Sequence, residues 1–135
     1  MATVFLDTNI FLRHLTGDHP EHSPKATAYL VRIERGEMKA RIADTVVFEV
    51  VFTLRSYYGH SKGEIRDTFL PIVEMAGIAL PGKRWLREVF DVYVEENVSF
   101  ADAFHATLMK HLGIEEIASF DMDFDRIPGV RRAAL

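Results

Sequence analysis

Apolar segments of two kinds alternate along the 135-residue chain, and this alternation is the feature that most limits its fold. Strand-like runs at 3–6, 40–43, 77–82 and 114–119 are separated by segments whose apolar residues follow helical spacing. Strands that alternate with helices are typical of a parallel sheet. The sequence therefore predicts an α/β fold, with a central, mostly parallel sheet flanked by helices, and a single domain over residues 1–135.

Residues that commonly begin and end helices mark the segments between these strands. Short polar side chains accept hydrogen bonds from the free N–H groups of a first helical turn, and glycine often follows a last turn. We expect helices to begin at Ser23 (before Pro24), Asp44, Ser61 (with Glu64) and Ser99, and to end at Gly36, Gly59 and Gly113.

The composition narrows the class of protein. The chain has no cysteine, which excludes a disulfide framework, a thiolate zinc site and a cysteine nucleophile, and is compatible with the cytoplasm. The first residues lack a basic region, and no apolar run approaches the roughly 20 residues of a membrane span, so we expect neither a signal peptide nor a membrane protein. The net charge of −4 disfavours binding nucleic acid by bulk electrostatics but is compatible with a nuclease that has an acidic metal pocket.

One acid, Glu49, interrupts an apolar stretch that runs from Val46 to Leu54. As a helix this stretch is apolar on nearly every face, so we expect it to be buried and its carboxylate to need a compensating charge. That charge is either a basic side chain, for which Arg13 is a candidate, or a bound cation. A buried ion pair carries a large desolvation cost, which favours the cation.

Other acids stand beside apolar segments far apart in the chain. Asp7 follows the first strand, at the edge where open α/β sheets bind ligands, although helix capping explains it equally well. Asp121 follows the last strand and is expected at the same edge. Asp102 lies three residues after Ser99, so a capping box is the simpler interpretation of that residue alone. Together these acids predict a site for Mg²⁺ or Mn²⁺.

Polar and basic residues near these acids are candidates for supporting roles. Asn9 is suited to orient a water molecule, and Arg13 shares its helical face and is a candidate for binding a substrate phosphate. The six histidines show no zinc-ligand spacing, and only His105 is expected near the acids.

The acidic run Asp121–Asp125 superficially resembles a calcium-binding loop. The glycine expected at its sixth position is replaced by Arg126, and no glutamate stands at the twelfth, which excludes an EF-hand. We expect Asp125 and the basic end of the chain, with Arg131 and Arg132, to be solvated.

Four segments in order, residues 5–13, 43–49, 100–106 and 119–124, resemble the motifs of the PIN-domain family of metal-dependent ribonucleases. The resemblance extends over nearly the whole chain. It is nearest to the VapC-type toxins of bacterial and archaeal toxin–antitoxin pairs, which are small, single-domain proteins. Ser119 stands where the family often has threonine, and the hydroxyl group is retained.

This resemblance implies a set of site residues and partners. It implies an RNA substrate, a cognate antitoxin whose C-terminal segment blocks the site, and a homodimer. Catalysis and metal binding would fall to Asp7, Glu49, Asp102 and Asp121, with Asp123 as an auxiliary metal ligand and Thr8, Asn9 and Ser119 as supporting polar residues.

Two other functions remain open. An aspartyl-phosphate phosphatase also places an acid after its first strand, but that chemistry needs a second acid where Asn9 stands. A PIN-like module that binds RNA or protein without cutting is disfavoured because all four acids are present.

Overall fold

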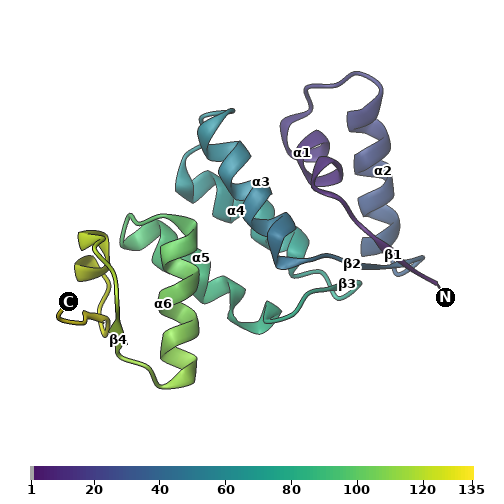
Figure 1. Cartoon of the computed structure of the whole chain (residues 1–135). Helices are drawn as coiled ribbons and strands as arrows, with labels where there is room; N and C mark the ends of the chain where they lie inside the picture. Colours follow the sequence, from purple (N-terminus) through teal and green to yellow (C-terminus); the bar gives the residue numbers. More distant parts are fainter. Residues whose placement is uncertain (1) are drawn as a thin grey trace. The chain divides into compact units, whose positions relative to one another are not determined.

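A computed structural model describes residues 2–135 and divides them into two compact units. The first unit extends to Lys83 and the second comprises Arg84–Leu135; they are coloured purple to teal and green to yellow in Figure 1. Each unit is described by itself. The single domain over residues 1–135 stays a prediction.

The first unit is built on a parallel sheet of three strands. The strand order is β1-β2-β3, and Ala40 of the middle strand pairs with Val4 on one side and Ile78 on the other. Parallel strands joined by helices confirm the predicted α/β class. The strands are β1 (Thr3–Phe5), β2 (Lys39–Arg41) and β3 (Ile78–Ala79).

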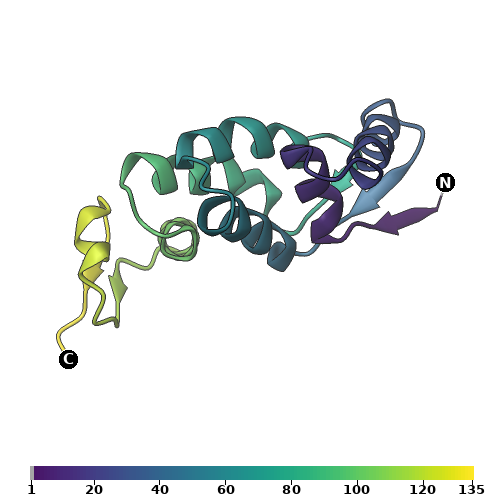
Figure 2. The same ribbon diagram turned by 90° about the horizontal axis from the view of Figure 1, so that it is seen from above.

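Four helices complete the first unit. The first two lie side by side in both views, and the first also packs against the third and fourth (Figures 1 and 2). Phe11 of the first helix and Phe69 of the fourth are fully buried, and their rings meet edge to face with 5.5 Å between the ring centroids. The helices are α1 (Thr8–Thr16), α2 (His22–Glu34), α3 (Asp44–Ser56) and α4 (Lys62–Val73).

The starts of two of these helices differ from the sequence expectation. The free N–H groups at the start of α2 are capped by His19, whose Nδ1 accepts hydrogen bonds from the backbone of Glu21 and His22, while Ser23 is buried inside the helix. For α3 the residue before the first turn is Ala43, and the structure shows no side-chain cap there. Asp44, expected as that cap, lies inside the first turn, where its carboxylate accepts a hydrogen bond from the backbone N–H of Thr45 at 2.8 Å. The Ser61 cap of α4 is confirmed.

The second unit combines two packed helices with a pair of parallel strands. Ser99 caps the second helix and Gly113 ends it in a left-handed conformation, φ 72°, both as predicted. The strand β5 was not predicted, because it is only two residues long and consists of arginines. The short 3-10 helix η1 (Lys83–Trp85) begins at the last residue of the first unit. The elements after it are α5 (Leu86–Glu95), α6 (Phe100–Leu112), β4 (Glu116–Ile117), η2 (Met122–Arg126) and β5 (Arg131–Arg132).

No helix within residues 2–135 is long and apolar enough to cross a bilayer.

Candidate metal site

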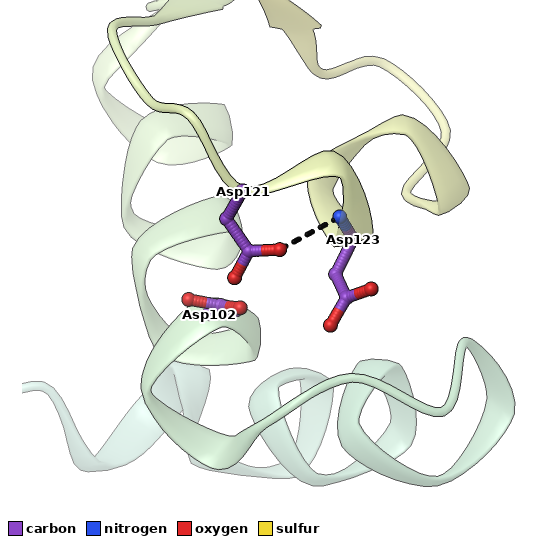
Figure 3. A group of neighbouring side chains, drawn as sticks. All are labelled: Asp102, Asp121 and Asp123. Atoms are coloured by element: carbon purple, nitrogen blue, oxygen red, sulfur yellow. Dashed lines mark hydrogen bonds between the residues drawn. The ribbon is translucent and has the colours of Figure 1, made fainter.

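Three aspartates of the second unit form the strongest candidate site. One carboxylate oxygen from each of Asp102, Asp121 and Asp123 lies within 4.8 Å of the other two (Figure 3). We call these residues the aspartate cluster. Carboxylate oxygens are the ligands that Mg²⁺ and Mn²⁺ prefer, so the cluster has the right chemistry for a divalent cation.

Asp102 is fixed in the first turn of α6. Its backbone N–H donates to the Ser99 Oγ at 3.1 Å, so the backbone of Asp102 is held by the helix cap while its carboxylate stays available to face the cluster. Asp102 takes part both in the helix cap, through its contact with Ser99, and in the aspartate cluster, so the two interpretations of this residue are compatible.

Asp121 and Asp123 are held by a chain of local hydrogen bonds. The Ser119 Oγ accepts a hydrogen bond from the backbone N–H of Asp121 at 3.0 Å. One Asp121 carboxylate oxygen accepts in turn from the backbone N–H of Asp123 at 2.9 Å, as Figure 3 shows. Asp121 thus acts as the N-cap of η2 and still directs a second oxygen toward Asp102.

The electrostatics of the cluster disfavour the negative charge of Asp102. The pKa of Asp102 is raised, chiefly by burial and then by the neighbouring charge of Asp121. The Ser99 contact and the nearby His105 act in the opposite direction and lower the pKa of Asp102. His105 is therefore near the acids, as expected. A cation bound to the cluster would relieve the repulsion.

The basic residues near the end of the chain form ion pairs that were not predicted. Asp125 is exposed, as expected, and it also accepts two hydrogen bonds from Arg132, at 2.9 and 3.0 Å. This pairing lowers the pKa of Asp125. Arg131 pairs with Glu116 at 3.0 Å, and Arg126 lies 3.6 Å from Asp123. Asp125 pairs with Arg132 and is not one of the three acids of the aspartate cluster.

In the first unit, Glu49 has a different environment from the one predicted. The residue is exposed, so the argument that its burial demands a compensating cation is wrong. The buried face of α3 consists of Val46, Val47, Val50, Val51 and Leu54, and Glu49 lies on the opposite side near Phe52, which is 71% exposed. An apolar helix need not be buried all round.

Glu49 is nevertheless tied to the start of α1. The Thr8 hydroxyl donates a hydrogen bond of 2.7 Å to the Glu49 carboxylate across 41 positions of sequence. Asp7 precedes Thr8 as the first residue before α1, and its side chain makes no cap hydrogen bond. The capping interpretation of Asp7 is therefore not supported within the described chain. The hydrogen bond between Thr8 and Glu49 therefore joins the segment that contains Asp7 to α3.

Arg13 does not pair with Glu49. Its guanidinium donates to Asp18 at 3.1 Å, and Asp18 also accepts from Thr16 at 2.8 Å and from Tyr58 at 2.6 Å. These hydrogen bonds, the Tyr58 one first, lower the pKa of Asp18 to about 2, so Asp18 stays ionised beside Arg13. Asp18 was not predicted, because Gly17 breaks the helical spacing between them in a left-handed turn, φ 61°.

Comparison with known proteins adds the family. The sequence model of the PIN domain matches residues 4–130 of the chain. The chain belongs to the PIN-domain family. A VapC ribonuclease of Aquifex aeolicus (strain VF5) is 24% identical over 122 residues, which is 90% of each chain.

Within this PIN domain, the structure distributes the predicted residues between the two units. The first unit holds Asp7, Thr8, Asn9, Arg13 and Glu49, and the Thr8–Glu49 hydrogen bond joins its two segments. The second unit holds Ser119 and the aspartate cluster. The structure thus brings Asp102, Asp121 and Asp123 together in the second unit, and it ties Glu49 to Thr8 in the first.

Proposed function

We propose that this PIN domain is a metal-dependent endoribonuclease that hydrolyses phosphodiester bonds of RNA, and that it is the toxin component of a toxin–antitoxin pair. The observation that carries this proposal is the aspartate cluster, in a chain that belongs to the PIN-domain family. The similarity to a protein named VapC ribonuclease supports RNA as the substrate.

The metal-binding and catalytic residues that we propose come from both units. Asp102, Asp121 and Asp123 supply the oxygens of the aspartate cluster, with Asp123 as the auxiliary ligand. Asp7 and Glu49 of the first unit would serve the same reaction. A bound Mg²⁺ or Mn²⁺ would lower the pKa of a water molecule and offset negative charge on the scissile phosphate.

The neighbouring polar residues would position these acids. Thr8 holds the Glu49 carboxylate through its hydroxyl, and Ser119 holds the backbone of Asp121. Asn9 is exposed at the start of α1, where its amide is accessible to a water molecule or to substrate. Each of these groups would fix a ligand or a water molecule without being an acid or a base itself.

The test is digestion of an end-labelled RNA with Mg²⁺, with Mn²⁺ and with EDTA. We expect internal cleavage with either metal, none with EDTA, and products that carry a 5′-phosphate, because water would be the nucleophile. Hydrolysis of a small phosphomonoester without RNA cleavage would instead indicate a phosphatase. RNA binding without cleavage under all three conditions would indicate a binding module.

The partners follow from the same proposal. A toxin of this kind requires a cognate antitoxin, and we propose a cytoplasmic homodimer whose cleavage activity the antitoxin blocks. Size measurement by light scattering, alone and after coexpression with the product of an adjacent small gene, tests both. A monomer that no coexpressed protein inhibits would contradict this part.

A further inference from the structure

A pocket of about 390 Å³ lies between α1 and α2, wholly within the first unit. From α1 it is lined by Asn9, Ile10 and Arg13, which share one side of the helix. The facing side of α2 contributes His22, Lys25, Ala26 and Tyr29, again at helical spacing. Both helices therefore present a continuous face to the same hollow.

The charged residues that line this pocket are basic, whereas the chain as a whole is acidic. The protein has a net charge of −4, yet the pocket lining includes Arg13 and Lys25 and no acid among the described residues that form it. Each of these cations pairs with an acid outside the lining, Asp18 and Glu21, and an anionic ligand would compete with these acids for them. Because the overall charge is negative, the attraction of an anionic ligand would be a property of the pocket and not of the whole surface.

Both cations are available to a ligand. Lys25 pairs with Glu21 at 3.1 Å, but the side chains of this pair are 72% and 67% exposed, so the pair is weak and exchanges readily. Arg13 uses one nitrogen for Asp18, and a guanidinium has five N–H donors in a fixed fork. Asp18, which also accepts a hydrogen bond from Tyr58, therefore orients Arg13 and leaves its other N–H donors available to a ligand.

Aromatic rings stand beside these charges. Tyr29 is half-buried in the pocket wall, with the Arg32 guanidinium 5.9 Å from its ring centroid. The His22 ring stacks on His19, with centroids 3.9 Å apart and planes within 9°. Cations that bind phosphate beside rings that stack on bases are the usual composition of a site for single-stranded nucleic acid.

We propose that this pocket is a subsite for a nucleotide of single-stranded RNA, with the phosphate on Arg13 and Lys25 and the base against Tyr29. The subsite rests on the proposed ribonuclease function and specifies how its substrate is held. Asn9 lines the pocket and is two residues from Asp7, so the pocket begins at the same end of α1 as that acid. An acidic peptide would satisfy the cations but would not use the ring.

The test is fluorescence anisotropy of a labelled single-stranded RNA in EDTA, where the RNA is not cut, over a series of salt concentrations. The variants are Lys25→Gln, Tyr29→Ala and Tyr29→Phe. Lys39→Gln is the matched control, because Lys39 is an exposed lysine of the same unit on β2 and does not line the pocket. Thermal melts of all variants establish that each one is folded.

We expect Lys25→Gln to weaken binding about fivefold or more and to reduce the salt slope by about 0.7, the value for one phosphate of a single strand. Tyr29→Ala should weaken binding by about tenfold, because stacking of one base is lost. Tyr29→Phe retains the ring and should bind within about twofold of the wild type. Lys39→Gln should leave the salt slope unchanged.

Equal binding by Lys25→Gln, Tyr29→Ala and the Lys39→Gln control would overturn the subsite. A labelled oligoglutamate, measured in the same way, represents an acidic peptide. If Lys25→Gln loses binding of this peptide while its RNA binding is unchanged, the RNA subsite is overturned and a peptide site is indicated. The two proposals fail separately. Metal-dependent cleavage that is insensitive to both pocket variants would refute the subsite and keep the nuclease. Pocket-dependent RNA binding without any cleavage would keep the subsite and refute the nuclease.

Discussion

The first unit gives Glu49 a hydrogen-bond donor, whereas the second unit places Asp102 against another carboxylate. The Thr8 hydroxyl contacts Glu49 at 2.7 Å, and Glu49 is exposed to water. Burial and the adjacent Asp121 raise the pKa of Asp102. Glu49 thus has a hydrogen-bond donor beside it, whereas Asp102 has a carboxylate beside it. Removal of these two contacts should change the stability of the metal-free protein in opposite directions.

The largest expected effect concerns activity, where the two groups of acids should behave alike. Asp102→Asn and Glu49→Gln should each reduce metal-dependent RNA cleavage by about 100-fold or more, because each removes a proposed ligand charge. Initial rates on an end-labelled RNA measure this. Asp44→Asn is the control, since Asp44 is another exposed acid on the helix of Glu49. Full activity in Glu49→Gln would remove the first unit from the proposed site.

The next effect is stabilisation by metal. A cation that binds only the folded protein, at about 100 times its dissociation constant, should add about 2.7 kcal/mol and raise Tm by several degrees. Differential scanning fluorimetry with Mn²⁺ and with EDTA measures the shift. Asp121→Asn should remove most of it, while Asp67→Asn, a change at an exposed acid of α4, should not. An undiminished shift in Asp121→Asn would place the metal elsewhere.

A smaller effect on stability is expected from the hydrogen bond between Thr8 and Glu49 in the first unit. Thr8→Val removes the hydroxyl that donates to Glu49 and should lower the free energy of unfolding by about 1 kcal/mol, the net value of one hydrogen bond. Urea denaturation in EDTA measures this change. In a double-mutant cycle with Glu49→Gln, the two changes should not be additive. Additive effects would show that the Thr8–Glu49 contact contributes nothing to stability.

The smallest effect should have the opposite sign. Without metal, Asp102→Asn should raise Tm at neutral pH by about 1–3 °C, less than 1 kcal/mol in a chain of this size. The folded pKa of Asp102 is raised, so its penalty is present above that pKa and fades as pH falls below the unfolded value of 3.8. The gain should therefore disappear in acid. A loss of Tm at neutral pH would contradict the repulsion within the cluster.

Local signals explain why the helix that bears Asp102 was predicted well. Ser99 and Gly113 determine the two ends of this helix through contacts with residues only a few positions away. Such local contacts can be predicted from the neighbouring sequence alone. The PIN-domain resemblance, which rests on the order of four motifs, was confirmed. The roles of the individual acids stay predictions.

The prediction of a buried Glu49 was wrong because the direction of a side chain depends on how its helix packs. The apolar run around Glu49 predicts a helix correctly, but it does not state that Val46, Val50 and Leu54 turn inward while Glu49 turns outward. The cap at His19 was missed because an imidazole nitrogen is an uncommon helix cap.

The division of the chain into consecutive stretches has a consequence for the order in which a ribosome produces the proposed enzyme. Asp7 and Glu49 are translated within the first unit, and all three residues of the aspartate cluster come later, in Arg84–Leu135. At about 5–20 residues per second, synthesis of that second stretch takes about 3–10 s. If the acids of both units are needed, a nascent chain carries no complete nuclease during this interval, and a ribosome that stalls before Asp102 releases a product that cannot cut RNA.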